Sequence, residues 1–416
     1  MPMAMAIGVL LFILSFGTSL IVHWGGFDRI LFQPSDPLGY YQFLPGTFIN
    51  HDLHGLPWVH RFSDGTGLSI FTIGVAWLQL PFFLIGHLVA VVIGSDADGY
   101  STPYAIAQLI GASSYLGLAA CMLFNVLTKR HSAMLAATVI LILYLATNLF
   151  YYSSFEAGMS HVYSFFLFSL LLYTTERSID HPRTWPWIWP IGALIVLVRP
   201  LNIFVLLIPL LYGIRSMNEP GSRLRDLFEG RIAWMMLGVA IALVLPQLLY
   251  WHAITGEFVL FTYGVKGESF DLSAPHLFDI LISHQNGWFV YTPIMLLVML
   301  RLLTDARSRG NGSRTILLCF AIAWYLYGSW WAWWLGGAFG YRGFIEYYAL
   351  LSIPLASLLQ WIYSEVRWMR VTSTALIVLF IFFNIRLSII YRPPWDGADW
   401  NWDRVGAAYR EALLIR

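Results

Sequence analysis

The stretch QPSDPLGYYQFLPGTFINHDLHGLPWVHR, residues 33 to 61, is the first polar segment of the chain, and it follows an apolar run. Its first acid, Asp36, lies between two prolines and shortly before Tyr40 and Tyr41. Only 11% of the 416 residues are charged, so a carboxylate at this place calls for an explanation. One interpretation is an ordinary turn, because aspartate beside proline is common turn chemistry. The other is a catalytic acid held at a membrane surface, where it would act as a general base.

The composition predicts a membrane protein. Hydrophobic residues make up 58% of the chain and the mean hydropathy is +0.66. Soluble domains carry about 25% charged residues, so most of this chain is expected to contact the lipid bilayer. Apolar runs of roughly the 20 residues that cross a bilayer recur from end to end. The formal net charge of +1 gives no indication of a nucleic-acid partner.

These runs predict an all-α, polytopic membrane protein that forms one integral-membrane domain over residues 1–416, with about eleven transmembrane helices. Because the first run has no basic residues before it and no cleavage pattern after it, we expect a retained span rather than a signal peptide. Residues 24–103 are expected to form an external loop that includes a juxtamembrane segment, and residues 392–416 an external tail. The expected spans lie near residues 3–22, 104–127, 133–151, 159–175, 187–213, 232–251, 287–300, 315–333, 345–363 and 371–391.

The basic residues predict how these spans are oriented, because cytoplasmic loops are enriched in lysine and arginine. If all the basic clusters are cytoplasmic, an even number of crossings must separate each neighbouring pair. Residues 187–213 satisfy this rule only as a hairpin of two short passes that turns at Arg199-Pro200. The clusters are Lys129-Arg130, Arg177/Arg183, Arg215 to Arg231, Arg301 to Arg314, and Arg367/Arg370.

The same count requires that residues 68–94 do not cross the membrane, or that they enter it and return. The central Gln79-Leu80-Pro81 of this segment is typical of a bent, interfacial or re-entrant segment. Asp36, Glu156, Arg199 and the stretch 330–348 then share the external side. The simpler explanation is that external loops are where polar residues accumulate.

The first loop contains further candidates for catalysis and binding. Asp52 is a second candidate catalytic acid, and Tyr40 and Tyr41 are candidates for substrate binding. The His60-Arg61 pair suits a lipid phosphate, although basic side chains also extend to the interface without binding anything. His51, Asp52 and His54 are metal ligands by type, but their close spacing without further acids makes a poor site. No metal site is predicted from them.

Arg199 is a further candidate for substrate binding, and two later stretches contain the remaining candidates. Glu156 and His161 follow a Tyr-Tyr pair at a membrane boundary and are placed to contact a substrate. The stretch 330–348, WWAWWLGGAFGYRGFIEYY, combines aromatic residues with glycines and charges. An interfacial aromatic belt explains the tryptophans, but not Arg342 and Glu346, which could hold a phosphate and a hydroxyl. Trp333 is a candidate to stack on a sugar ring.

No phosphate-binding loop or dinucleotide fingerprint is present in the chain. A transferase of this kind would therefore take an activated donor from the membrane, such as a lipid phosphate. No cofactor is predicted, and a requirement for a divalent metal stays open.

The chain resembles the integral-membrane glycosyltransferases of the GT-C type, which include the protein O-mannosyltransferases and the lipid A aminoarabinose transferase. The resemblance rests on Asp36 in the first external loop, the short non-crossing segment after it, the Tyr-Tyr…Glu segment 151–156 and the Arg-Pro break at 199–200. Four strings also resemble a group of bacterial proteins usually placed with these enzymes. They are DPLGYYQFLP (36–45), MSHVYS (159–164), GWFVYTP (287–293) and the stretch 330–348.

The resemblance implies that a sugar is transferred with inversion from a polyprenyl-phosphate donor to a lipid, glycan or protein acceptor. It also implies that Asp36 is the base, and that the site lies on the extracytoplasmic face of a bacterial inner membrane. Two features depart from the family pattern. Pro37 follows Asp36 where many relatives have a second acid, and residues 60–65 lack the basic-proline element found before the non-crossing segment.

Two other classes of function stay open. A transporter or flippase for a lipid-linked or amphipathic solute would use broken helices and intramembrane charges, often in two related halves, but the sequence shows no internal symmetry. A non-catalytic assembly partner of a cell-envelope enzyme is the third interpretation.

Overall fold

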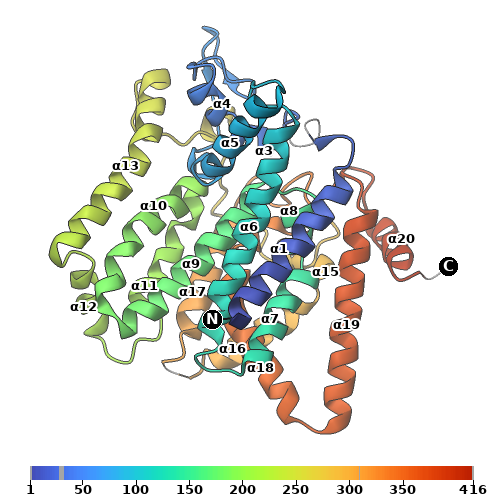
Figure 1. Ribbon diagram of the computed structural model, residues 1–416. Coiled ribbons are helices and arrows are strands. Elements are labelled where there is room, and N and C mark those ends of the chain that lie inside the picture. The colour runs from blue at the N-terminus through green and yellow to red at the C-terminus, as the bar shows by residue number, and fades with distance from the viewer. Residues whose placement is uncertain (1, 28–31, 309, 415–416) are drawn as a thin grey trace.

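A computed structural model describes residues 2–27, 32–308 and 310–414, and almost all of its regular structure is helical (Figure 1). The longer helices are α1 (Pro2–Val22), α5 (Gly74–Ile93), α6 (Thr102–Leu127), α7 (Ala133–Leu145), α9 (Ser160–Asp180), α10 (Ile188–Val198), α13 (Gly230–Thr255), α16 (Ile294–Asp305), α17 (Ser313–Gly328), α18 (Tyr348–Ser364), α19 (Arg367–Ile390) and α20 (Trp402–Ala412). The shorter elements are α3 (Asp36–Tyr41), α4 (Phe43–Phe48), β1 (His60–Arg61), β2 (Gly67–Leu68), α8 (Leu149–Ser154), η1 (Pro182–Trp187), η2 (Pro200–Leu206), α11 (Leu207–Leu211), α12 (Glu219–Asp226), η3 (Gly264–Lys266), α14 (Asp279–Ile282), α15 (Trp288–Tyr291) and η4 (Arg342–Phe344).

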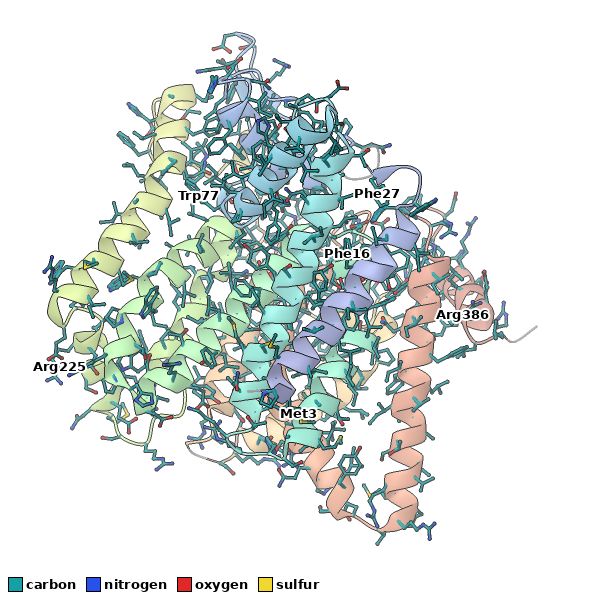
Figure 2. The ribbon with its side chains drawn as sticks, in the orientation of Figure 1. Met3, Phe16, Phe27, Trp77, Arg225 and Arg386 are labelled. Atoms are coloured by element: carbon teal, nitrogen blue, oxygen red, sulfur yellow. The ribbon has the colours of Figure 1, made fainter. Side chains whose placement is uncertain are left out.

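Five helices among the described residues are long and apolar enough to cross a membrane: α1, α5, α6, α13 and α19. At 1.5 Å per residue, such helices approach or exceed the roughly 30 Å thickness of the hydrocarbon core. Large apolar side chains stay exposed on their outer faces, for example Ile241 and Leu249 on α13 and Val378 on α19 (Figure 2). Water would oppose such exposure and lipid would not, so the helices support a membrane protein.

The other expected spans fall on shorter or more polar helices, so about eleven crossings remains a prediction. The expected span 133–151 is divided into α7 and α8, with Thr147 and Asn148 between them. Helix α9 has the length of a span, but it carries Glu176, Arg177 and Asp180 at its end. Short helices and polar residues are therefore the reasons that length and hydropathy support five of the described helices as spans.

Helices α1 and α6 pack closely in antiparallel directions. A Cβ atom on Gly8 would lie 2.7 Å from the carbonyl oxygen of Gly117. Further along, the hydroxyls of Ser15 and Ser113 lie 3.2 Å apart. The end of α1 and the start of α6 therefore lie at the same end of the molecule, and so does the chain that connects them (Figure 1).

Within this connection, residues 68–94 do not enter and return. Gly74–Ile93 is one continuous helix, α5, although it contains Pro81. Near this proline, the Tyr115 hydroxyl of α6 donates to the carbonyl of Leu78 at 2.7 Å. The expected re-entrant turn at Gln79-Leu80-Pro81 is therefore wrong, whereas the interfacial alternative stays a prediction.

The predicted turn of the chain at Arg199-Pro200 is confirmed, whereas the two membrane passes on either side of it stay a prediction. Helix α10 ends at Val198, Arg199 is extended with φ −151° and ψ 106°, and η2 begins at Pro200. A Cβ atom on Gly192 would lie 3.2 Å from the Leu206 side chain, so η2 folds back along α10. Proline has no N–H to continue a helix and disfavours helical geometry in the residue before it, which explains the turn.

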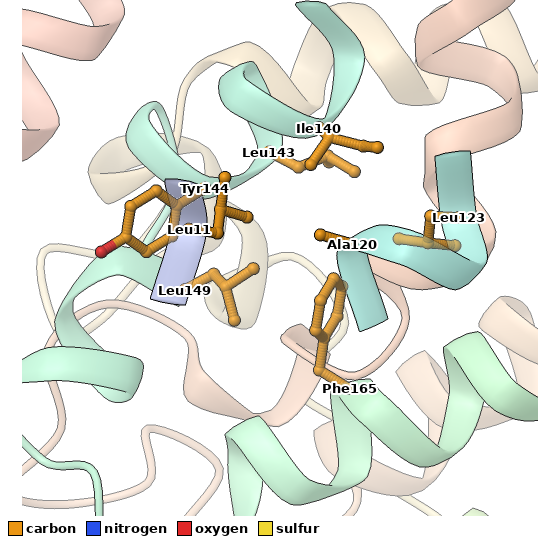
Figure 3. A pocket seen from close by; sticks show the side chains of 8 residues that line it. All are labelled: Leu11, Ala120, Leu123, Ile140, Leu143, Tyr144, Leu149 and Phe165. Carbon is orange, nitrogen blue, oxygen red and sulfur yellow. The ribbon is translucent and has the colours of Figure 1, made fainter. Parts of the chain in front are cut away.

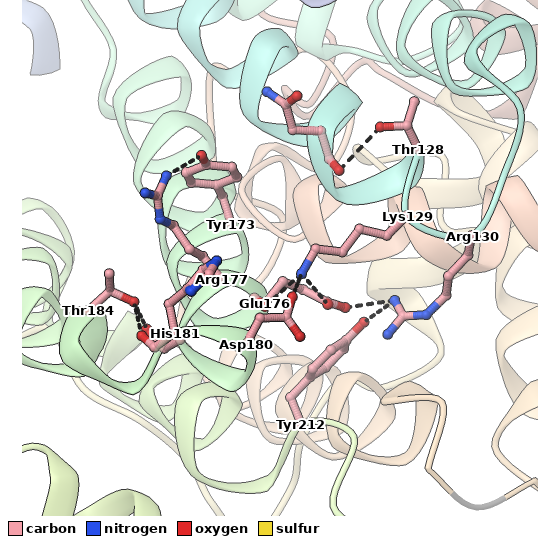
Figure 4. A network of polar contacts seen from close by, with 12 residues as sticks. Thr128, Lys129, Arg130, Tyr173, Glu176, Arg177, Asp180, His181, Thr184 and Tyr212 are labelled. Atoms are coloured by element: carbon pink, nitrogen blue, oxygen red, sulfur yellow. Dashed lines mark hydrogen bonds and ion pairs between the residues drawn. The ribbon is translucent and has the colours of Figure 1, made fainter. Parts of the chain in front are cut away.

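The opposite end of the molecule is held by an ion-pair network (Figure 4). Arg130 and Lys129 follow α6, and both contact the buried Glu176 of α9, at 2.6 and 3.4 Å. Lys129 also pairs with Asp180 at 2.8 Å, and Arg130 donates to the Tyr212 hydroxyl after α11. The basic segments around α12 and between α16 and α17, and between α18 and α19, lie toward this same end in Figure 1.

We expect single cysteines at the two ends to react from opposite sides of a membrane. The two native cysteines, Cys121 and Cys319, are first replaced. Asp96→Cys then puts a cysteine on the exposed loop between α5 and α6, and Arg225→Cys puts one on the exposed surface of α12. An impermeant maleimide should label the first from outside intact cells and the second only after the cells are opened. Labelling of both from the same side would contradict the arrangement.

Candidate functional site

A cluster of charged residues lies where four separate segments meet. Asp36 begins α3, His161 lies in the first turn of α9, and Arg199 is the hairpin turn. Arg342 begins η4, and Glu346 lies between η4 and α18. Ion pairs link Asp36 with Arg342 and Arg199 with Glu346. The distant parts of the sequence that contained candidate residues therefore do come together. We call these five residues the charged cluster.

Glu346 is the most buried member of the charged cluster, with 0% of its surface exposed. Its Oε1 accepts hydrogen bonds from Arg199 Nη1 at 3.0 Å and from Asn202 Nδ2 at 3.2 Å. The Arg199 guanidinium also lies 5.6 Å from the centre of the Tyr327 ring. A buried carboxylate is tolerated only when it is paired and hydrogen-bonded. These contacts therefore fix Arg199 in one place.

His161 takes part in this arrangement as a neutral acceptor. Its Nδ1 lies 3.2 Å from Arg199 Nη1 and 3.5 Å from Glu346 Oε2. A guanidinium can only donate, so Nδ1 accepts and the ring proton belongs on Nε2. The contact with Glu346 is then not an ion pair, and Arg199 is the cation that balances the buried carboxylate.

The second ion pair is longer and more open. Arg342 Nη2 lies 3.4 Å from Asp36 Oδ2, where the Asp36 side chain is 39% exposed and that of Arg342 is 17% exposed. The loop 155–159 lies directly against this pair, since a Cβ atom on Gly158 would lie 2.8 Å from the Pro37 side chain. This contact places Glu156 beside the Asp36–Arg342 pair.

Glu156 adds a third carboxyl group to this edge of the charged cluster. It accepts a hydrogen bond from the Tyr151 hydroxyl at 3.2 Å. Burial raises the pKa of Glu156 to about 7, while the positive charge of Arg342 opposes the rise. The negative charge of Asp36 adds to it. At neutral pH, Glu156 is therefore divided between its charged and uncharged forms.

Aromatic side chains surround the charges. Tyr40, which was predicted, is buried and lies edge-on to Phe71 with ring centres 4.7 Å apart. Tyr263, from the loop after α13, meets Trp330 edge-on at 5.7 Å. Burial raises the pKa of Tyr263, and the nearby Tyr40 and Asp36 raise it further.

Three members of this environment were missed by sequence reasoning: Asn202, Tyr263 and Tyr327. Asn202 could have been identified from the sequence, because it is a polar residue in an apolar run just after the Arg199-Pro200 break. The two tyrosines had none, since the chain contains 22 tyrosines and only packing distinguishes these two.

The structure does not bring all the predicted residues to the charged cluster. Asp52 is exposed and accepts from the backbone N–H of His54 at 2.8 Å, as in an ordinary turn. His60 and Arg61 form β1, which pairs with β2 in antiparallel register, and Arg61 is exposed. Neither Arg61 nor Asp52 makes an ion pair or side-chain hydrogen bond with the charged cluster among the described residues.

Two aromatic candidates also face elsewhere. The Tyr41 hydroxyl donates to the carbonyl of Gly99, and its ring stacks on Phe32 with centres 4.6 Å apart. Tyr41 therefore belongs to a second apolar cluster with Phe43 and Tyr104. Trp333 stacks on His276 at 5.1 Å, away from the ion pairs.

Among the described residues, neither a metal centre nor the cavity of Figure 3 competes with this site. Within the described ranges, no group of three or more histidine, cysteine, aspartate or glutamate side chains is arranged to hold a metal ion. The cavity in Figure 3 has an apolar lining that includes Leu11, Leu143 and Phe165. Its volume of about 10 Å³ is at the lower limit for one water molecule, so it is a packing defect.

Comparisons of the chain with protein-family models, curated proteins and solved structures gave no match. The chemistry of the charged cluster itself must therefore suggest the function. Among the described residues, Arg199 Nε and Nη2 have no hydrogen-bond partner, and Arg342 has only its 3.4 Å contact with Asp36. The side chains of both arginines are partly accessible, at 19% and 17%. The site can therefore bind an anion beside an accessible carboxylate.

Glu346→Gln should destabilise the fold, because it removes one partner of a buried ion pair. The free energy of unfolding should fall by on the order of 3 kcal/mol, measured by denaturing-detergent titration. The double variant Arg199→Gln/Glu346→Gln should recover part of this loss, since no uncompensated charge remains. A double variant that loses the sum of the two single losses would contradict the pairing.

The raised pKa of Glu156 predicts how the free energy of unfolding depends on pH. An unfolded glutamate loses its proton near pH 4.3, whereas folded Glu156 keeps its proton up to about pH 7. Between these values the folded state binds more protons, so this group makes the protein less stable as pH rises. Glu156→Gln should lack that contribution. The stability difference between the wild type and the variant should therefore change between pH 5 and 7 and then level off, and a constant difference would contradict the assignment.

Proposed function

We propose that the protein is a membrane glycosyltransferase that transfers a sugar from a polyprenyl-phosphate-linked donor to an acceptor hydroxyl, with inversion. The observation that carries this proposal is an accessible carboxylate, Asp36, beside two arginines whose remaining donors face accessible space. Such a site supplies a base for the acceptor and cations for the leaving phosphate. Arg61 lies on an exposed strand. Arg199 and Arg342 are therefore better candidates for the donor cation.

The reaction uses these groups in a single displacement. The acceptor oxygen attacks the anomeric carbon of the donor sugar while Asp36 takes the acceptor proton. The bond between the anomeric carbon and the phosphate oxygen breaks, and the lipid phosphate leaves with the electron pair. Arg199 and Arg342 stabilise its negative charge through bidentate hydrogen bonds. Attack from the face opposite the leaving group inverts the configuration.

A lipid-borne donor fits the surroundings of the charged cluster. Helix α5 begins at Gly74, where a Cβ atom would clash with the backbone of Leu197 and Val198, just before Arg199. From there α5 exposes an apolar surface that includes Leu88 and Val92. A polyprenyl chain could lie along this surface with its phosphate at the arginines. The absence of a nucleotide-binding signature in the sequence agrees with a donor of this kind.

The charge distribution suggests the side of the membrane on which the reaction takes place. The charged cluster lies at the Arg199 turn of the α10–η2 hairpin, whereas Tyr212 and the basic network lie at its other end. By the positive-inside rule, the basic end is cytoplasmic. We therefore infer that the site opens to the extracytoplasmic face, in the inner membrane if the protein is bacterial.

Asp36→Asn should reduce transfer by about 10²–10⁴-fold, the usual contribution of a general base, while the protein still folds and inserts. The assay is transfer to a panel of acceptors in proteoliposomes that contain synthetic polyprenyl-phosphate sugars. The matched control is Asp64→Asn on the exposed turn after β1, where an asparagine can also accept from the Thr66 backbone N–H.

Unchanged transfer in Asp36→Asn would refute Asp36 as the base. Wild-type protein that moves the labelled donor lipid across the bilayer without transferring sugar would instead support the transporter interpretation.

A further inference from the structure

We propose that Arg342 exchanges partners during the reaction: it pairs with Asp36 in the empty site and with the donor phosphate in the loaded site. Binding of the donor would then release Asp36 to act on the acceptor. This inference rests on the proposed function and adds an order to it, in which the donor binds before the acceptor is activated.

The two arginines are held very differently. Arg199 donates at 3.0 Å to a carboxylate that is fully buried and that Asn202 also contacts. Arg342 has one contact with Asp36, at 3.4 Å, which is longer than the 2.7–2.9 Å of a strong charge-assisted hydrogen bond. Arg199 is therefore a fixed cation, and Arg342 is the one that can change partner.

The backbone on both sides of Arg342 is closely packed. Phe344, two residues on, is fully buried against Trp288 and Phe320, with ring centres 4.9 and 4.8 Å apart. Gly340, two residues before, has φ +62°, and a Cβ atom there would lie 2.9 Å from the Tyr291 side chain. Rotation of the arginine side chain is therefore the motion that an exchange of partners would use.

The partners of Arg342 also differ in what an exchange would cost. Asp36 is 39% exposed, so water can replace the guanidinium when it leaves. A phosphate oxygen pair matches the planar fork of arginine and can accept two parallel hydrogen bonds. The negative charge of Asp36 acts on both Arg342 and Glu156, so the three groups lie close together. The carboxylate and the phosphate therefore compete for one guanidinium.

The competition has a functional consequence. In the empty site, an oxygen of Asp36 faces Arg342 and is not available to an acceptor proton. Once the phosphate holds Arg342, this oxygen is released beside the position of the donor sugar. An acceptor hydroxyl, including water, would meet an active base only when a donor is present.

The test is a double-mutant cycle on binding of polyprenyl phosphate without a sugar to the full-length protein in nanodiscs. Asp36→Asn should tighten binding by roughly threefold or more, because Arg342 no longer has a competing partner, and Arg342→Gln should weaken it by about tenfold or more. In the Arg342→Gln background, Asp36→Asn should have no effect. Asp64→Asn, the exposed control, should bind as the wild type does.

Each other outcome overturns the exchange. If Asp36→Asn tightens binding equally in the presence and absence of Arg342, the acid repels the phosphate through space and holds no partner. If Asp36→Asn does not tighten binding at all, the ion pair does not compete with the ligand. Arg342→Lys keeps the charge and provides the same comparison in a variant that is less disruptive to the fold. In this background, Asp36→Asn should tighten binding of polyprenyl phosphate less than it does in the wild type.

The outcome can be separated from failure of the proposed function. Coupled binding without any sugar transfer would leave the exchange in place and refute the transferase. Transfer that depends on Asp36, without tighter binding in Asp36→Asn, would keep the transferase and refute the exchange.

Discussion

The need to compensate one fully buried carboxylate organises the functional end of this protein. Glu346 follows the η4 turn, and it is compensated by Arg199 and Asn202, which come from the break between α10 and η2. His161, from the start of α9, completes the contacts of Arg199. In a low-dielectric interior such a charge is stable only with these partners in place. The three segments are therefore held in one arrangement, which also fixes the position of the Arg199 guanidinium.

In this arrangement the two arginines have different surroundings. Arg199 is tied to a buried acid and has donors left over, whereas Arg342 is tied weakly to an accessible acid. In the proposed reaction, the site binds an anionic lipid and activates a hydroxyl, which requires both a fixed cation and a free base. The proposed exchange of Arg342 between Asp36 and a phosphate would connect these two requirements. It would also explain why the acid and the cation of the proposed reaction begin as a pair.

Much of the charged cluster could be predicted from sequence because polar residues are costly in an apolar chain. Asp36, Arg199, Arg342, Glu346 and the neighbouring Glu156 each interrupt hydrophobic surroundings, and the parity of the basic loops predicted that they share one side. The same reasoning also selected polar residues that lie away from the charged cluster. Asp52 accepts a hydrogen bond within a turn, and Arg61 belongs to an exposed strand pair. Gln79-Leu80-Pro81 does not break α5, which continues through the proline.

The amino-acid sequence by itself determined that the chain is apolar and helical, that it turns at Arg199-Pro200, and that its charges are few and concentrated. These properties follow from composition and from the backbone limits of proline, which act locally. Only the tertiary structure decided which charges pair, because pairing depends on the packing of segments far apart in sequence, such as Gly158 against Pro37. It likewise decided that Tyr263 and Tyr327, rather than Tyr41 or Trp333, surround the site. Residue type alone does not show which aromatic side chains lie at the site. The direction in which each element packs decides this.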